Sequence, residues 1–215
     1  MFNKIFWNLQ SYTWDDYLIS SNYASEIKEI IKIVTDNCNI KNPKLLDLGC
    51  ATGNFSIEFA LNNFFVTGLD FSSQMIKIAT QKALKLNITN IEFILFDILD
   101  INKLDKNCYN VLFASHIFHL IENNDILFKE YAKKICSNGI FVFVIKTKRI
   151  PKTNLHKTKF INILTNLLRK ILFSKYKNIP PNIQNLTKNL LELGFTNILE
   201  TDTTNNKVLI FRKCN

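Results

Sequence analysis

The 215-residue sequence lacks any long apolar run. Its longest uninterrupted run is Ile140–Ile145, whereas a helix that crosses a bilayer needs about 20 apolar residues. The first ten residues hold no sustained apolar segment, and no small-residue cleavage site follows them, so no secretory signal peptide is predicted. We therefore expect a soluble, cytoplasmic protein.

Paired cysteines are also missing. The five cysteines are widely spaced and none forms a Cys-x-x-Cys pair: Cys38, Cys50, Cys108, Cys136 and Cys214. An odd number at such spacing argues against a disulfide framework and against a zinc site. We expect reduced, mostly buried thiols and no metal.

Acidic residues are absent between Glu130 and Glu192, although the stretch holds 13 of the 27 basic residues. Since the net charge of the chain is +9, the rest of the chain carries −4. Within the stretch, apolar residues recur at helical spacing from Phe160 to Leu172, which predicts a basic amphipathic helix. Such a helix would attract an acidic partner, an anionic substrate or an anionic membrane surface. The alternative is a general abundance of lysine, because the chain has 24 lysines and only 3 arginines.

Buried-strand patterns alternate with helical patterns through the middle of the chain. The near-continuous apolar runs are Lys44–Gly49, Phe64–Asp70, Ile91–Asp97, Tyr109–Ser115 and Gly139–Lys146. Helical periodicity is found at Asn54–Asn62, Ser72–Leu86, Glu122–Cys136 and Ile183–Leu193. This alternation predicts an α/β fold whose mostly parallel sheet has helices on both faces.

The chain is predicted to form one domain, residues 1–215. It comprises an N-terminal helical cap (1–43), a core (44–146), a basic helical lid after the fifth strand (147–182), and a C-terminal helix and hairpin (183–215). Gly194 is expected to end the last helix. The hairpin, Ile198–Asp202 and Lys207–Lys213, brings the predicted sheet to seven strands.

The strongest local signal is Leu45-Leu46-Asp47-Leu48-Gly49-Cys50-Ala51-Thr52-Gly53, a strand that runs into a glycine-bearing turn and then a helix. Such a turn lets backbone approach a ligand closely, beside a helix N-terminus. The next two strands end at Asp70 and Asp97, where carboxylates suit the ribose and base of a nucleoside. For each aspartate alone, helix capping is the alternative interpretation. The Gly-x-Gly-x-x-Gly spacing of dehydrogenases is absent.

These motifs resemble those of the class I S-adenosylmethionine-dependent methyltransferases of the small-molecule type, over roughly Lys44 to Lys146 and the C-terminal hairpin. The resemblance implies a Rossmann-like fold and S-adenosyl-L-methionine as cofactor. It implies contacts with that cofactor from the following residues: Asp47, Gly49, Cys50, Ala51, Gly53, Asp70, Phe71, Met75, Asp97, Ile98 and Ser115. The sequence departs from the family pattern at Ala51, where a glycine is usual, and at Asn110, where an aspartate is usual.

Methyl transfer mainly requires that the acceptor atom be aligned with the methyl group. A carboxylate acceptor needs no base, whereas a phenol or an ammonium group would use one, and His116 is the candidate. A purely structural role for His116 is the alternative. The predicted substrate pocket comprises Trp14, Tyr17, Tyr23, His116 and Arg149. The N-terminal aromatics have an alternative role as a cover for the sheet edge.

Three functions follow from these patterns. The first is methylation of a small-molecule or carrier-bound acid, as in malonyl-acyl-carrier-protein O-methyltransferases, with the basic lid binding an acidic carrier. The second is methylation of a lipid or quinone at a membrane surface. The third is a nucleic-acid-binding module or a non-catalytic relative. Nucleic-acid binding is disfavoured because the aromatic residues are not interleaved with the basic ones. The departures at Ala51 and Asn110 leave the non-catalytic relative open.

Overall fold

The computed structural model describes residues 2–20, 23–105, 108–117, 125–147 and 182–214. The predicted lid falls almost entirely outside the described residues, as do Arg149 and the segment 118–124. Within the described parts, no helix has the length and apolar character needed to span a membrane.

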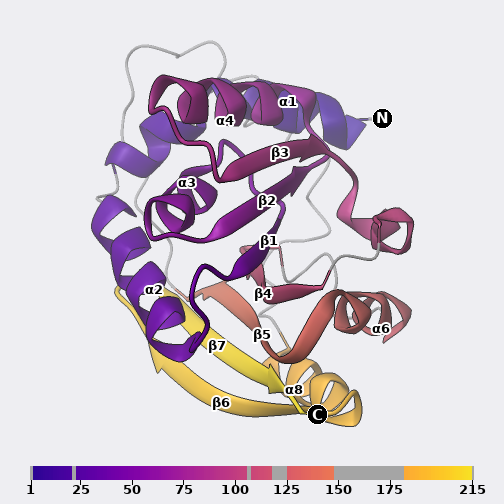
Figure 1. Ribbon diagram of the computed structural model, residues 1–215. Coiled ribbons are helices and arrows are strands. Elements are labelled where there is room, and N and C mark those ends of the chain that lie inside the picture. Colours follow the sequence, from indigo (N-terminus) through magenta and orange to yellow (C-terminus); the bar gives the residue numbers. More distant parts are fainter. Residues whose placement is uncertain (1, 21–22, 106–107, 118–124, 148–181, 215) are drawn as a thin grey trace.

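A seven-stranded sheet forms the centre of the molecule, in the order β3-β2-β1-β4-β5-β7-β6 (Figure 1). The strands are β1 (Lys44–Leu48), β2 (Phe65–Asp70), β3 (Ile91–Leu95), β4 (Tyr109–Ser115), β5 (Ile135–Lys146), β6 (Phe195–Asp202) and β7 (Asn206–Lys213). Strands β1 to β5 are parallel, and β7 runs antiparallel to both β5 and β6. The predicted Rossmann-like sheet with its C-terminal antiparallel hairpin is confirmed.

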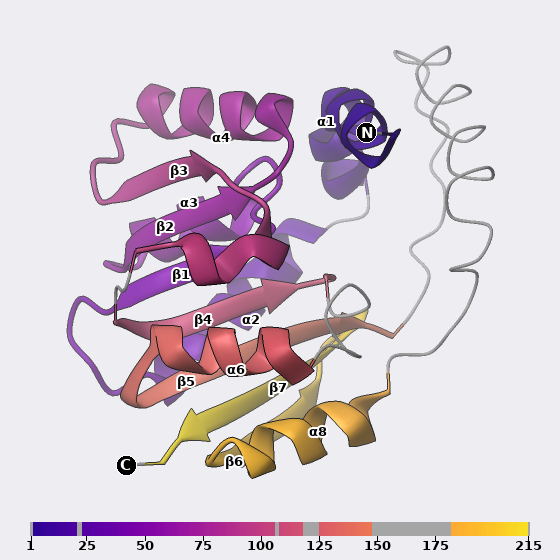
Figure 2. The same cartoon turned by 90° about the vertical axis from the view of Figure 1, so that its right-hand side faces the viewer.

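Helices cover both faces of the sheet (Figure 2). The helices are α1 (Phe2–Ser20), α2 (Tyr23–Asn37), α3 (Asn54–Leu61), α4 (Ser73–Lys85), the 3-10 helix η1 (Ile98–Lys103), α6 (Asp125–Lys134) and α8 (Ile183–Glu192). One apolar core lies between the sheet and α2 and α3, and the other lies between the sheet and α6 and α8. Helix α4 packs along β3, with α1 beside it.

Local sequence explains several element ends. Ser72 caps α4, because its Oγ accepts a hydrogen bond from the backbone N–H of Met75 at 3.2 Å. Gly194 follows α8 with a φ of 79°, the left-handed conformation that glycine adopts without strain. Strands β1 and β4 are apolar along most of their length because helices bury both faces of the sheet there.

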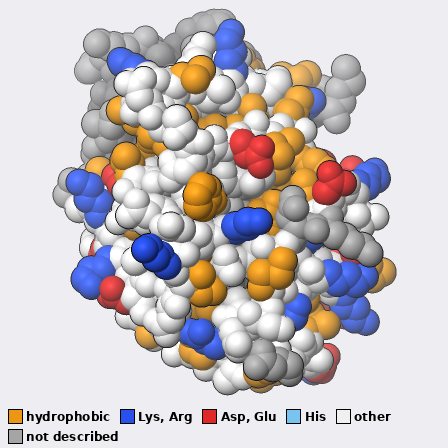
Figure 3. Space-filling model, viewed as in Figure 1, with side chains coloured by type: hydrophobic (Ala, Val, Ile, Leu, Met, Phe, Trp, Pro, Cys, Tyr) orange, Lys and Arg blue, Asp and Glu red, His pale blue; other side chains and the backbone are white. Residues whose placement is uncertain are grey.

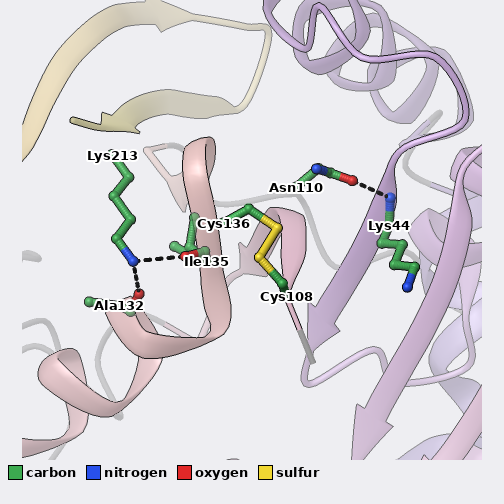
Figure 4. The surroundings of a disulfide bond; sticks show 7 residues. All are labelled: Lys44, Cys108, Asn110, Ala132, Ile135, Cys136 and Lys213. Atoms are coloured by element: carbon green, nitrogen blue, oxygen red, sulfur yellow. Dashed lines mark hydrogen bonds between the residues drawn. A yellow bond between two sulfur atoms is a disulfide. The ribbon is translucent and has the colours of Figure 1, made fainter. Parts of the chain in front are cut away.

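The expectation that all the cysteines are reduced is wrong for one pair. Cys108 and Cys136 form a disulfide with their Cα atoms 5.0 Å apart (Figure 4). The pairing of β4 with β5 sets Tyr109 opposite Ile135, which brings the two neighbouring cysteines together. Nothing in a separation of 28 residues predicts that contact.

Basic side chains are dispersed among apolar and polar ones on the face shown in Figure 3. Some basic side chains of the described residues make structural contacts, on whichever face they lie. The Lys213 Nζ, for example, donates hydrogen bonds of 2.8 Å to the carbonyl oxygens of Ala132 and Ile135 (Figure 4).

Candidate functional site

The strand order places a ligand site at one edge of the sheet. The chain builds β1, β2 and β3 outward in one direction and then returns to place β4 on the other side of β1. In open α/β sheets, ligands bind outside the carboxyl ends of the strands at such a reversal of order. Figure 1 shows β4 on the opposite side of β1 from β2 and β3. Gly49 follows β1 and His116 follows β4, so both lie at this switch point.

The turn after β1 has an unusual backbone. Gly49, Ala51 and Gly53 all have positive φ angles, of 71°, 49° and 78°. A Cβ on Gly49 would lie 2.9 Å from the Ile117 Cγ2, and one on Gly53 would lie 2.7 Å from the Phe93 Cζ. Glycine is required at both positions because of the left-handed backbone and the close packing. Ala51 adopts the same conformation, so its replacement of the family's glycine leaves the turn intact.

Asp70, at the end of β2, is bound to this turn. The Ala51 N–H donates to its Oδ2 at 3.0 Å, and the Ser72 N–H donates to its Oδ1 at 2.8 Å. Its side chain is buried, and this burial raises the pKa of Asp70 to about 6, although the two N–H groups lower it and the Asp97 charge raises it further. Each carboxylate oxygen can accept a further hydrogen bond. The carboxylate therefore suits a ligand with two neighbouring hydroxyl groups.

Asp47 lies deeper, within β1. The Ser56 Oγ donates to its Oδ2 at 2.5 Å. Burial raises the pKa of Asp47 to about 7, while the Ser56 hydrogen bond lowers it and the Asp70 charge raises it. Two carboxyls with raised pKa values thus adjoin the glycine turn, Asp47 in the strand that precedes it and Asp70 through a hydrogen bond with Ala51. The thiol of Cys50, also buried, has its pKa raised well above the ordinary value by burial and by the charges of Asp47 and Asp70.

Asp97 differs from the other two aspartates because it is exposed. Its Oδ1 accepts a hydrogen bond from the Leu99 N–H at 3.0 Å, so it caps η1, as the alternative interpretation held. Ile98 is buried, and its carbonyl accepts a hydrogen bond of 2.9 Å from the Tyr131 hydroxyl. Phe71 is half-buried and Met75 is buried at the start of α4.

Helix α1 is anchored to the same region by polar contacts that the sequence analysis did not predict. The Asp15 Oδ1 accepts hydrogen bonds from the Thr52 hydroxyl at 2.6 Å and the Asn54 amide at 2.9 Å, and Lys82 forms an ion pair with Asp15 at 3.2 Å. The Asn8 Oδ1 accepts a hydrogen bond of 2.5 Å from the Ser72 hydroxyl. These contacts hold α1 against the glycine turn and α4, and the residues that make them belong to no recognisable sequence motif.

Two of the predicted pocket residues meet after β4. The Tyr23 hydroxyl lies 3.2 Å from the His116 Nε2, and the rings are 6.0 Å apart. Ser115, the last residue of β4, directly precedes His116 in the chain and is half-buried. Trp14 instead packs edge-on against Trp7, with ring centroids 5.8 Å apart. The side chains of Tyr17 and Arg149 lie outside the part of the chain that the structure describes.

A family model described as a methyltransferase domain matches residues 39–198. A Haemophilus influenzae protein of uncharacterised function is 32% identical over 122 residues, which are 55% of this chain and 47% of that protein. A carboxy-S-adenosyl-L-methionine synthase of Helicobacter pylori is 30% identical over 118 residues, 53% of this chain and 47% of that enzyme. The matched region spans about half the length of these curated relatives.

Solved structures share the fold at low sequence identity. A structure from Methanococcus maripaludis, described as a putative S-adenosyl-L-methionine-dependent methyltransferase, has a TM-score of 0.68 at 20% identity and covers 97% of this chain and 94% of its own. Magnesium protoporphyrin IX methyltransferase from Synechocystis, with bound SAM, has a TM-score of 0.61 at 18% identity, covering 89% and 79%.

Proposed function

The chain belongs to the class I S-adenosylmethionine-dependent methyltransferases, and from this membership we propose that it transfers the methyl group of S-adenosyl-L-methionine to a small-molecule or carrier-bound acceptor. The observation that carries the proposal is Asp70, a buried carboxylate at the end of β2 that the Ala51 and Ser72 N–H groups hold beside the glycine turn.

The residues at this edge suit the proposed cofactor. Asp70 would accept hydrogen bonds from the two ribose hydroxyls, and the backbone of the Gly49–Gly53 turn would lie along the methionine part, next to Asp47. Asp97 and the backbone of Ile98 would lie at the adenine. When bound, S-adenosylmethionine supplies an electrophilic methyl group on a sulfonium ion. The chain would hold the acceptor in line with that methyl group and exclude water.

We propose a carboxylate as the first acceptor group to test, free or attached to a carrier protein, because it can attack without a base. The acid-free basic stretch supports an acidic carrier as partner, and an anionic membrane surface is its competitor. A hydroxyl or amine acceptor is the second candidate, and it is supported by the position of His116 after β4, with its Nε2 3.2 Å from the Tyr23 hydroxyl.

Calorimetric titration with S-adenosylmethionine and with its demethylated product tests the cofactor site. In Asp70→Asn, one of the two backbone N–H groups would face an amide NH₂, and the ribose would lose a charged partner. We expect affinity to fall about 10- to 150-fold, the equivalent of about 1.5–3 kcal/mol for hydrogen bonds to a charged group. Asp36→Asn is the matched control, since Asp36 is an exposed residue of α2 whose partner is Lys32.

Absence of binding by the folded wild-type protein would refute the proposed activity. Equal affinity of Asp70→Asn and wild type would refute the assignment of the ribose to Asp70. Once binding is established, transfer of labelled methyl groups to free and carrier-bound carboxylates tests the acceptor, because a methyl ester releases its label in mild base and methyl ethers or amines do not.

A further inference from the structure

A buried polar cluster adjoins the candidate site and joins three distant parts of the chain. Tyr23 and Glu26 come from the start of α2, His116 follows β4, and Asn206 begins β7. Asn206 has no exposed surface, and Glu26 is 3% exposed. The Asn206 Oδ1 lies 2.7 Å from the His116 Nε2, and the Asn206 Nδ2 lies 2.7 Å from the Glu26 Oε1.

Glu26 is held entirely by neutral donors in these contacts. It accepts hydrogen bonds from the Thr203 hydroxyl at 2.6 Å, from the Asn205 N–H and side-chain amide at 2.8 and 2.9 Å, and from Asn206. Burial raises the pKa of Glu26, but these hydrogen bonds outweigh it and the pKa lies below the ordinary value. Glu26 is therefore ionised at neutral pH.

An ionised carboxylate only accepts hydrogen bonds, so it determines the orientation of the Asn206 amide. The opposite orientation would set the Asn206 oxygen against the Glu26 oxygen at the same short distance. The nitrogen of Asn206 consequently faces Glu26, where it also lies 3.3 Å from the Tyr23 hydroxyl, and its oxygen faces His116. Because that oxygen cannot donate, the Nε2 of His116 must carry a hydrogen. In the neutral ring the lone pair is then on Nδ1.

The backbone of His116 is constrained as well. Its φ angle is 58°, a left-handed conformation that is uncommon for residues other than glycine, and its N–H donates to the Val144 carbonyl at 2.9 Å. Such conformations persist where the surroundings enforce them, and they are concentrated at functional sites.

We propose that Glu26 and Asn206 are positioning residues that hold His116 as its Nε2–H tautomer, so that Nδ1 is the nitrogen that takes the proton of a hydroxyl or amine acceptor. In that step the acceptor atom forms its bond to the methyl carbon, the electron pair of the broken carbon–sulfur bond stays on sulfur, and the acceptor's proton passes to Nδ1. This role rests on the proposed methyl transfer, but the tautomer does not.

Nitrogen-15 NMR of the full chain, labelled at histidine, reads the tautomer directly without cofactor or acceptor. Spectra are recorded about two pH units above the ordinary histidine pKa of about 6.5, so that a neutral ring is observed. The His116→Gln variant identifies the His116 signals among the three histidines. We expect the His116 signals of the wild-type protein to show only the Nε2–H pattern.

A matched pair of variants tests Asn206 as a positioning residue, with Asn205 as the control. Asn206→Leu removes, at nearly constant volume, the amide oxygen that can only accept from Nε2, and it leaves the Tyr23 hydroxyl, which can either accept from Nε2 or donate to it. We therefore expect both tautomers to appear. Asn205→Leu removes a neighbouring amide that also binds Glu26 but has no hydrogen bond to His116 among those described, so we expect the wild-type pattern. An Nδ1–H or mixed pattern in wild type, or an unchanged pattern in folded Asn206→Leu, overturns the proposal. If Asn206→Leu does not fold, the wild-type pattern still decides.

Titration with S-adenosylmethionine separates this proposal from the proposed function. We expect Asn206→Leu to bind the cofactor within about twofold of wild type, since Asn206 lies outside the glycine turn. Wild-type protein that shows the Nε2–H pattern without binding cofactor would refute the methyltransferase activity and leave the tautomer intact.

Discussion

Cofactor affinity should depend on the ionisation of Asp70. A ribose diol donates two hydrogen bonds, which an ionised carboxylate accepts better than a neutral carboxylic acid does. Because burial raises the pKa of Asp70 to about 6, the group changes charge within a pH range in which a folded protein can be studied. Binding favours the ionised form, so the affinity for S-adenosylmethionine should rise as pH rises through about 6.

The size of the effect follows from the ionised fraction. With a pKa of about 6, Asp70 is about 97% ionised at pH about 7.5 and about 9% ionised at pH about 5. If only the ionised form binds, the dissociation constant should increase about tenfold as the pH is lowered from about 7.5 to about 5. This change corresponds to about 1.4 kcal/mol of binding free energy.

Calorimetric titration at half-unit steps across this range provides the measurement. The upper limit keeps most of the ligand's own amino group protonated, because the ordinary pKa of that group is about 7.7–8.0. Thermal unfolding at each pH confirms that the protein is folded. Asp70→Asn is the critical control, because its side chain does not titrate, and its weaker binding should be nearly independent of pH over the same range.

Two results would refute the reasoning. A wild-type affinity that stays constant from pH about 5 to about 7.5 would mean that Asp70 does not carry the diol or that its pKa is not raised. A slope that persists in Asp70→Asn would assign the titration to another group, with Asp47 the first candidate because its pKa is raised to about 7.

Two further predictions concern stability, measured by urea unfolding. Gly53→Ala should lower the free energy of unfolding by about 2–4 kcal/mol, because it combines left-handed strain with a Cβ placed 2.7 Å from Phe93. Gly194→Ala should lower it by only about 1–2 kcal/mol, because the same backbone strain arises but a Cβ would meet no described heavy atom within 4 Å. Equal losses in the two variants would contradict the packing argument. The raised pKa of Asp47 means that the folded state binds more protons than the unfolded state does, so the free energy of unfolding should fall as pH rises from about 4 to about 7. Asp47→Asn should make that fall smaller. A fall of the same size in the variant would show that Asp47 is not its source.

The fold was largely predictable because its signals are local. Ser72 lies between a predicted strand and a helical pattern, and it caps α4. Gly194 likewise follows α8 in the left-handed conformation. The predicted ends of the strands were less accurate. The strand predicted to begin at Gly139 begins at Ile135, and the one predicted to end at Asp97 ends at Leu95, because pairing with neighbouring strands decides where each strand stops.

The candidate site was predictable where it follows strand ends. Asp70 ends β2, as predicted, and it accepts a hydrogen bond from the Ala51 N–H of the glycine turn. Asp97 also lies at a strand end, yet it is exposed and caps η1, which sequence position cannot distinguish from ligand binding. The roles of all these residues stay predictions until binding is measured. His116 was identifiable as a candidate only because it follows the fourth strand.

The sequence by itself determined the order of strands and helices, the glycine turn after β1 and the carboxylates at successive strand ends, since these depend on periodicity and turn chemistry within a few residues. The tertiary structure alone decided which distant residues meet. Asn206 and Glu26 are 180 positions apart, Asp15 and Thr52 are 37 apart, and the bridged cysteines are 28 apart. Such contacts depend on which strands pair in the sheet and in which register, and no local pattern encodes that pairing. The tautomer of His116 is therefore a property of the fold and not of the motif.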